Sequence, residues 1–431
     1  MNNSETTRTG FFDKSKLFIK VAVIFFMALF LTIPSFFIND LVTERRSRQS
    51  EAITDITSKW GKEQMVQGPL LVVPYEYKTP QNSLISGKAY FLPAKLQTRA
   101  ILIPEKRYRG IYQVAVYRAG IKMEGSFDPL NWQSLKIPKE GLLWNQAALV
   151  YKVSDAEKGI NEDVSIKWDD SSRLFSPQEE GLSNIKDAFA ASLPLDDASI
   201  SQPHRFSMSF TLNGSQQLLL ATAARENEID MRSTWNSPSF TGVRLPDSRS
   251  VSNSGFMAKW KFLNRSIPAA WKDGSYSFEN TAIGADLKIP VDGYDKTQRA
   301  TKYAILCIIL TFASFFLIET MYKRYLHLVH YGLAGLALVL FYTLLLSVSE
   351  YSSFNIAYLV AGLATIGLVT WFIGSILKSS KLSVFISFVL AVVYGYIFCI
   401  IQLEDYSLLM GSIGLFIALA VIMYFSRRLK W

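Results

Sequence analysis

Six long apolar stretches, unevenly spaced along the chain, constrain this 431-residue sequence more than any other feature. A membrane-spanning helix needs about 20 mostly apolar residues, because the hydrocarbon layer is about 30 Å thick and a helix rises about 1.5 Å per residue. The expected spans are residues 17–38, 302–320, 330–348, 354–377, 382–403 and 407–425. The sequence therefore predicts a polytopic α-helical membrane protein with six transmembrane helices, one before and five after a large insertion.

The insertion has ordinary soluble composition and divides into two parts. Residues 39–62 are predicted to form a stalk helix, because Ile53, Ile56 and Trp60 recur at helical spacing. Residues 63–301 are predicted to be a β-rich domain, because polar and apolar residues alternate in segments such as 204–212 and 256–262. Further strands are expected at 70–77, 88–92, 96–103, 111–118, 121–127, 147–153, 218–223 and 276–283, with a short helical patch near 184–191.

The first apolar stretch has two interpretations, an uncleaved anchor or a cleaved signal peptide. Basic residues precede it, as they would in either case. A signal core has about 7 to 15 apolar residues and ends at a site of small residues. Residues 17–38 form a longer run that continues through Pro34 to Asn39, so the anchor is favoured.

Lys and Arg in the short connections predict the orientation of the chain. Lys and Arg follow the second, fourth and sixth spans, whereas connections 349–353 and 404–406 carry acidic residues and no Lys or Arg. This pattern puts both tails, 1–16 and 426–431, in the cytoplasm and the large domain outside. In a bacterium with two membranes the protein then lies in the inner membrane, with its large domain in the periplasm.

The net charge of +9 does not indicate a nucleic-acid partner. Residues 41–300 contain 33 Lys and Arg against 29 Asp and Glu, so most of the excess lies in the membrane part and the tails. We therefore expect contact with the lipid bilayer and no nucleic acid. Both cysteines, Cys307 and Cys399, fall within expected spans, and His204 is the one histidine of the large domain. No metal and no cofactor is predicted.

No sequence motif of a known catalytic site is present, so we predict that the protein is not an enzyme and assign no catalytic residue. Charged residues at the ends of spans are the better candidates, because charge at membrane depth is costly. Glu319, Lys323 and His327 form one predicted cluster on the cytoplasmic side. Glu319 could carry a proton. The alternative is a structural pair with Lys323, four residues further on.

A second charged group is expected at the outer ends of the helices. The connection after the third span is short, so Glu350 should lie near Arg299 and Lys302 at the start of the second span. These three residues could tie the large domain to the helices. Alternatively, each of them points separately into the lipid head groups.

Aromatic residues of the large domain offer a third candidate. The stretch 235–246 includes Trp235, Pro238 and Phe240, and together with Trp260 it could form an exposed recognition loop. Packing of these rings in a core explains them at least as well.

Several short motifs in chain order resemble the CreD family of bacterial inner-membrane proteins. They include Gly68-Pro69-Leu70, Phe91-Leu92-Pro93, Trp235-Asn236-Ser237-Pro238, Val291-Asp292-Gly293-Tyr294, Arg299-Ala300-Thr301-Lys302 and Gly335-Leu336-Ala337-Leu338. The resemblance implies a protein of cell-envelope integrity, produced under a two-component system that responds to envelope stress and linked to β-lactam and colicin phenotypes. It supplies no settled chemistry and no agreed active site. The leading hypothesis is therefore a non-enzymatic envelope protein whose β-rich periplasmic domain binds or senses a wall, lipid or protein partner. A transporter, or a handler of lipids or wall precursors, that uses Glu319 or Glu350 is the alternative, and an enzyme that acts on envelope glycans or lipids comes third.

Overall fold

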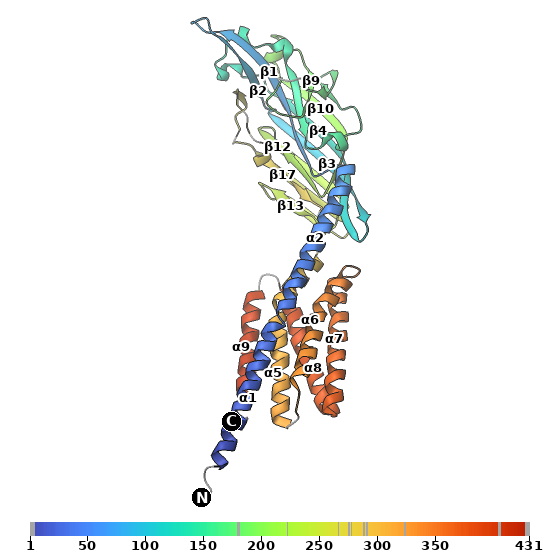
Figure 1. The fold of residues 1–431 in the computed structure, drawn as a ribbon. Helices are drawn as coiled ribbons and strands as arrows, with labels where there is room; N and C mark the ends of the chain where they lie inside the picture. The colour runs from blue at the N-terminus through green and yellow to red at the C-terminus, as the bar shows by residue number, and fades with distance from the viewer. Residues whose placement is uncertain are drawn as a thin grey trace. The chain divides into compact units, whose positions relative to one another are not determined.

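The computed structural model describes residues 5–178, 182–221, 223–265, 267–274, 276, 278–287, 289, 292–322, 325–403 and 407–426. The chain forms two compact units (Figure 1). The helical unit consists of residues 1–50 and 290–431, and the β unit consists of residues 51–289.

The described part of the helical unit is built from long α-helices. They are α1 (Glu5–Phe30), α2 (Ile33–Trp60), α4 (Asp292–Lys302), α5 (Ala304–Tyr322), α6 (Leu328–Ser349), α7 (Phe354–Leu377), α8 (Ser380–Gln402) and α9 (Ser407–Ser426). Four of them, α5 to α8, are long and apolar enough to cross a bilayer. Their buried residues share one core, which includes Phe312, Tyr331 and Tyr394. Helix α9 has 20 residues at the expected position of the sixth span.

The first expected span, 17–38, is not one continuous helix, which corrects the sequence prediction. Helix α1 ends at Phe30 and α2 begins at Ile33, with a turn at Leu31 and Thr32. The cause is Pro34. Proline has no backbone N–H to donate to the carbonyl of Phe30, and its ring clashes with that carbonyl. The apolar helical segment before the break, Phe18–Phe30, is shorter than a usual span.

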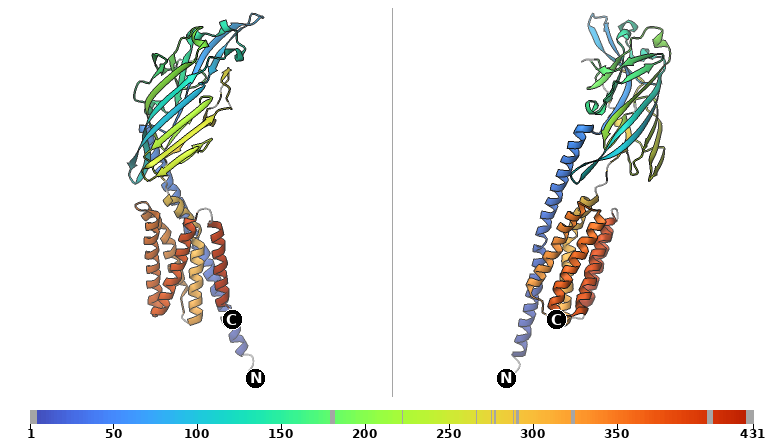
Figure 2. Two further views of the ribbon diagram at one scale, coloured as in Figure 1. Left: turned by 180° about the vertical axis from the view of Figure 1, so that it is seen from behind. Right: turned by 90° about the vertical axis from the view of Figure 1, so that its right-hand side faces the viewer.

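The β unit contains two sheets (Figure 2). Among the described residues, the first sheet has the order β13-β17-β11-β1-β5-β9-β8, with β2 paired to β1 and β16 paired to β2. Its strands are β1 (Gln64–Lys78), β2 (Leu84–Phe91), β5 (Ala148–Val153), β8 (Ser176–Pro177), β9 (Ala188–Ser192), β11 (Gln217–Ala221), β13 (Ser239–Gly242), β16 (Ala270–Lys272) and β17 (Ala282–Asp286). Parallel pairing of β1 with β11 makes this sheet mixed.

The second sheet has the order β14-β15-β12-β3-β4-β10-β6-β7. Its strands are β3 (Lys95–Arg109), β4 (Tyr112–Phe127), β6 (Ser165–Trp168), β7 (Ser171–Leu174), β10 (His204–Ser215), β12 (Glu226–Ser233), β14 (Ser248–Ser252) and β15 (Gly255–Leu263). Strands β3 and β4 form a long hairpin, and Gly110 turns it at a φ of +60°, which suits glycine. The main core includes side chains of both sheets, among them Leu71, Tyr117 and Trp260.

Sheet pairing corrects several local predictions. The patch 184–191 is not helical, because Ala188–Ser192 form strand β9 between β5 and β8. The expected strands 111–118 and 121–127 are one strand, β4. Residues 279–281 form the 3-10 helix η5, and strand β17 begins only at Ala282. Residues 292–301, which the sequence assigns to the β-rich domain, belong instead to helix α4 (Asp292–Lys302).

Within the expected stalk 39–62, α2 is helical as far as Trp60, and Gly61 follows its last residue. Gly61 has a φ of +139°, and a Cβ atom there would lie 2.8 Å from the carbonyl oxygen of Asn213. Only glycine fits such a position without strain. The chain therefore leaves the helix sharply and enters strand β1 at Gln64.

Candidate functional site

The Glu350 cluster lies within the helical unit, at the C-terminal end of α6. Only 9% of the Glu350 side chain is exposed, and its Oε1 lies 3.3 Å from Nε of Arg45 in α2. The hydroxyl of Tyr294 in α4 donates to the same oxygen over 3.5 Å. These contacts join α2, α4 and the end of α6.

Two further polar contacts reinforce the attachment of α2 to α4. Arg46 forms an ion pair with Asp295 and also donates to Oε1 of Gln298 over 3.3 Å. Two turns before Arg46, Asn39 accepts a hydrogen bond of 2.9 Å from the hydroxyl of Thr301. Helix α2 is therefore held to α4 along two turns by side-chain contacts.

The predicted partners of Glu350 were Arg299 and Lys302. Both lie on helix α4, which was not predicted. The ion pair found at Glu350 joins it to Arg45, and the side chain of Lys302 is exposed. Arg45 was not predicted as a partner, because it lies in the segment that follows the first span, about 300 residues before Glu350 in the chain. The helical continuation of that span past Ile38 was the signal that could have placed Arg45 near α4.

The Glu319 cluster lies at the opposite end of the same helices. Lys20 of α1 forms an ion pair with Glu319 of α5, and the two side chains are only 16% and 13% exposed. Lys20 Nζ also donates to the carbonyl oxygen of Leu326 over 2.8 Å and lies 4.4 Å from the ring centroid of Tyr325. The hydroxyl of Tyr331 donates to the second carboxylate oxygen of Glu319 over 3.0 Å.

The other two predicted members of the Glu319 cluster are Lys323 and His327. Lys323 lies outside the described residues. His327 caps α6, because its Nδ1 accepts a hydrogen bond of 3.3 Å from the backbone N–H of Val329. Lys20 was missed, although a lysine inside an apolar stretch signals the need for a carboxylate partner. Among the described residues, no group of three or more His, Cys, Asp or Glu side chains is arranged to hold a metal ion.

The aromatic residues of the proposed recognition loop are packed in the core, which corrects that interpretation. Trp260 and Trp235 are 1% and 9% exposed. Phe240 packs edge-on against Trp260, with ring centroids 6.0 Å apart. Of the neighbouring residues, Leu245 is instead 73% exposed. The exposed part of this stretch therefore consists of residues between and after these rings, such as Asn236 and Leu245.

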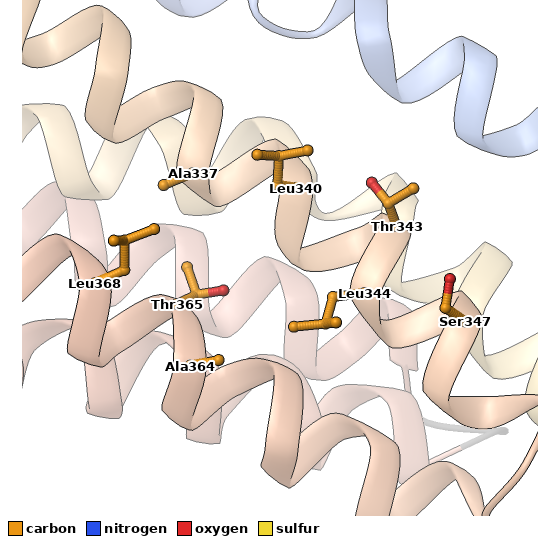
Figure 3. Close-up of a pocket in the computed structure, with 8 residues that line it drawn as sticks. All are labelled: Ala337, Leu340, Thr343, Leu344, Ser347, Ala364, Thr365 and Leu368. Carbon is orange, nitrogen blue, oxygen red and sulfur yellow. The ribbon is translucent and has the colours of Figure 1, made fainter.

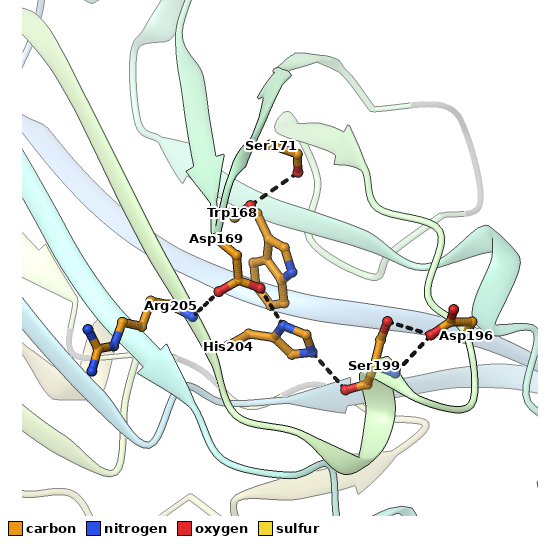
Figure 4. Close-up of polar contacts among 7 residues, drawn as sticks. All are labelled: Trp168, Asp169, Ser171, Asp196, Ser199, His204 and Arg205. Atoms are coloured by element: carbon orange, nitrogen blue, oxygen red, sulfur yellow. Dashed lines mark hydrogen bonds and ion pairs between the residues drawn. The ribbon is translucent and has the colours of Figure 1, made fainter.

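His204 and Asp169 form the most prominent polar cluster of the β unit (Figure 4). Nδ1 of His204 lies 2.6 Å from Oδ2 of Asp169, and Nε2 lies 2.7 Å from the backbone carbonyl oxygen of Ser199. The Ser199 hydroxyl points away and donates to Asp196 over 2.6 Å. Both nitrogens of the ring are thus occupied and neither faces a hydroxyl, so these residues do not form a Ser-His-Asp triad. The cluster joins the β6–β7 turn to the start of β10.

Helices α6 and α7 enclose a shallow groove of about 390 Å³ (Figure 3). It is lined by Ala337, Leu340, Thr343, Leu344 and Ser347 of α6 and by Ala364, Thr365 and Leu368 of α7. The lining is apolar apart from three hydroxyl groups. A second, larger depression of about 580 Å³ is lined almost wholly by apolar side chains of α5, α8 and α9. Neither lining contains a charged residue, and surfaces of this kind suit contact with lipid chains.

The fold defines a multi-pass membrane protein that carries a large two-sheet domain between its first and later apolar helices. The family model "Inner membrane protein CreD" matches residues 16–431. Inner membrane protein CreD of Escherichia coli (strain K12) is 31% identical over 430 residues, which cover 97% of this chain and 94% of that relative. The chain belongs to the CreD family, and it is a multi-pass protein of the inner membrane with no catalytic domain indicated.

Proposed function

We propose that this protein supports the integrity of the cell envelope by binding or sensing an envelope component with its β unit. In this proposal the chain crosses the membrane six times, both tails are cytoplasmic, and the β unit lies in the periplasm. The β unit acts by binding rather than by catalysis. Helix α2 connects that binding to the helical unit.

The observation that carries the proposal is that α2 is one helix of 28 residues whose two halves are fixed in different units. In the helical unit, Arg45 and Arg46 hold it to Glu350 and Asp295. A helix attached in this way can pass a displacement along its length, because its hydrogen-bonded backbone resists bending.

In the β unit, the end of α2 is attached as firmly. Asp55 forms an ion pair with Arg109, and the hydrogen bonds from Lys59 and Arg109 lower the pKa of its carboxyl group. The indole N–H of Trp60 donates to the carbonyl oxygen of Tyr117 over 3.2 Å. The guanidinium group of Arg107 covers the Trp60 ring at 4.9 Å. Hairpin β3–β4 therefore holds the last two turns of α2.

A break in α2 between its two attachments tests this proposal. Glu51 is exposed in the helix, and Glu51→Pro removes one backbone hydrogen bond and costs the helix about 3 kcal/mol. Glu51→Ala preserves the helix and serves as the matched control. In cells whose own copy is deleted, we expect the proline variant to reach the membrane at a normal level and to lose tolerance of wall-active antibiotics. Full tolerance with the proline variant would contradict the proposal.

A carrier that uses Glu319 or Glu350 is the second candidate, and the burial of both carboxylates favours it. Each carboxylate is, however, paired with a cation from α1 or α2, so a carrier cycle would have to release that cation. Purified protein in liposomes that contain a pH-sensitive dye tests this function. A carrier predicts proton flux that disappears in Glu319→Gln. The absence of any flux in the unsubstituted protein would exclude proton-coupled transport through this residue.

A further inference from the structure

A polar pocket of about 580 Å³ opens at the edge of the β unit where the two sheets meet. Its walls come from the segment after β13, the end of β15 and helix η5 (Glu279–Thr281). Three cations, Arg244, Lys261 and Arg265, line it together with Asn264, Asn280 and Thr281. The volume falls within the range of about 300 to 1,000 Å³ that is usual for small-molecule sites.

The charged residues that line this pocket in the described part of the chain are all positive. Among the side chains that the structure describes, the nine that line the pocket include no acidic residue. Several exposed cations elsewhere in the β unit pair with carboxylates, as Lys95 does with Glu226 and Lys122 with Glu124. Within the described ranges, none of the ion pairs includes any of the three pocket cations. Two acidic residues lie close to Lys261: Asp247 accepts a hydrogen bond of 2.6 Å from its backbone N–H, and Glu228 stands opposite it in the β12–β15 pair. Three like charges around one cavity repel one another until an anion occupies it.

The backbone that carries these cations is fixed by the core. The buried indole of Trp260 donates to the carbonyl oxygen of Arg244 over 3.2 Å. The Arg244 guanidinium lies over the Phe262 ring, 5.2 Å from its centroid. The backbone N–H of Asn264 donates to the carbonyl oxygen of Arg225 over 2.8 Å. A ligand would therefore meet cations on a backbone that is already in place, which lowers the cost of binding.

We propose that this pocket binds a small acidic glycopeptide through a free carboxylate, the chemical class of soluble cell-wall fragments. The inference rests on the proposed binding role of the β unit and names its ligand. Guanidinium groups match a carboxylate with two parallel hydrogen bonds. The cavity is much larger than a single oxyanion, so the acid must carry an organic body. Asn264 and Asn280 add amide groups to the wall, and the Thr281 hydroxyl, which donates to the carbonyl oxygen of Phe278 over 2.8 Å, can still accept a hydrogen bond from an amide or sugar group.

Calorimetry on the full chain in phosphatidylcholine nanodiscs tests the proposal. The probe is muramyl dipeptide with its free carboxylate, and its carboxamide analogue is the matched control ligand. We expect the acid to bind at least tenfold more tightly than the amide. Raising NaCl from about 50 to 500 mM should weaken binding severalfold, because the pocket is open to solvent and its charges are screened.

Glycerol 1-phosphate and inorganic phosphate complete the set of ligands. The former represents a lipid headgroup and the latter a bare ion. Both should bind more weakly than the muramyl acid. Tighter binding of glycerol 1-phosphate would overturn the glycopeptide assignment in favour of a phosphate headgroup, and the absence of binding by every probe would overturn the site itself.

Charge-removing variants locate the binding. Arg244→Gln, Lys261→Gln and Arg265→Gln should each weaken binding of the acid by about tenfold. Lys167→Gln on β6 makes the same charge change on an exposed residue outside the pocket and should have no effect. All of these side chains are exposed, and equal melting temperatures will show that the variants fold. Unchanged binding in the three pocket variants would overturn the proposal.

The helix-break variant separates this inference from the proposed function. If cells with Glu51→Pro lose tolerance while no probe binds, the proposed coupling through α2 is supported and the pocket assignment is wrong. If the acid binds as expected while cells with Glu51→Pro remain fully tolerant, the pocket assignment is supported and the coupling through α2 is wrong.

Discussion

The partner of Glu350 is the most specific structural claim about the helical unit, and a double-mutant cycle measures it. The structure pairs Glu350 with Arg45 at 3.3 Å, whereas Lys302, a candidate from the sequence, has an exposed side chain. The two cycles are Arg45→Gln with Glu350→Gln and, as the control, Lys302→Gln with Glu350→Gln.

The expected magnitude follows from burial. A fully exposed ion pair contributes about 0.2 to 1 kcal/mol, whereas removing one partner of a fully buried pair costs about 3 to 5 kcal/mol. The Glu350 side chain is 9% exposed and that of Arg45 is 37% exposed, so solvent screens one partner. We expect a coupling free energy of about 1 to 2 kcal/mol for Arg45 with Glu350. For Lys302 with Glu350 the effects should add to within about 0.5 kcal/mol.

The assay is unfolding in mixed detergent micelles by increasing fractions of SDS, followed by far-UV circular dichroism. Each variant is compared with the unsubstituted chain at the same protein concentration. Additive effects for Arg45 and Glu350, or a coupling of Glu350 to Lys302 instead, would refute the reasoning from distance and burial.

Three further predictions concern single side chains. Trp260→Ala should destabilise the β unit by about 3 to 5 kcal/mol, because the ring is 1% exposed. Unfolding followed by near-UV circular dichroism measures this loss. A stability near that of the unsubstituted protein would contradict the core position of the ring. The pKa of Asp230 is lowered mainly by hydrogen bonds from Arg232. The stability from this pair should therefore be present above about pH 4 and be lost as the pH falls through the lowered pKa, and Asp230→Asn should flatten that part of the acid unfolding curve. Lys20→Gln should cost about 1 to 3 kcal/mol in SDS unfolding by leaving Glu319 buried without its cation, whereas Lys20→Arg should cost clearly less.

The apolar helices could be predicted from the sequence because hydropathy is a local property. The expected span 354–377 has the same bounds as α7, and the spans 330–348 and 382–403 differ from α6 and α8 by no more than two residues at either end. Hydropathy did not predict the helix break within residues 17–38, where one proline divides the apolar stretch between α1 and α2.

Pairing between distant segments could not be predicted, because nothing local in the sequence specifies it. Ala188–Ser192 have a composition that suits a helix, yet they form β9 because β5 lies beside them. Strand β1 reads as a continuous apolar run rather than as an alternation. The structure explains this run, since a second cluster that includes Leu70, Tyr90 and Trp271 covers the other face of its sheet.

For the site residues, too, local features could be predicted from the sequence and contacts between distant segments could not. Glu319 and Glu350 could be selected because charge at a membrane edge is unusual, but their partners Lys20 and Arg45 come from helices about 300 residues earlier in the chain. The pocket cations Arg244, Lys261 and Arg265 meet only after the two sheets have formed, so they carry no signal in the sequence.

Cysteine labelling tests the orientation on which the proposed function depends. In a chain with Cys307→Ser and Cys399→Ser, Leu245→Cys places a thiol on the β unit and Tyr325→Cys places one between α5 and α6, at side chains that are 73% and 74% exposed. A membrane-impermeant maleimide applied to intact spheroplasts should label the former at once and the latter only after the membrane is permeabilised. Labelling of Tyr325→Cys in intact spheroplasts, with Leu245→Cys protected, would contradict a β unit that faces the envelope.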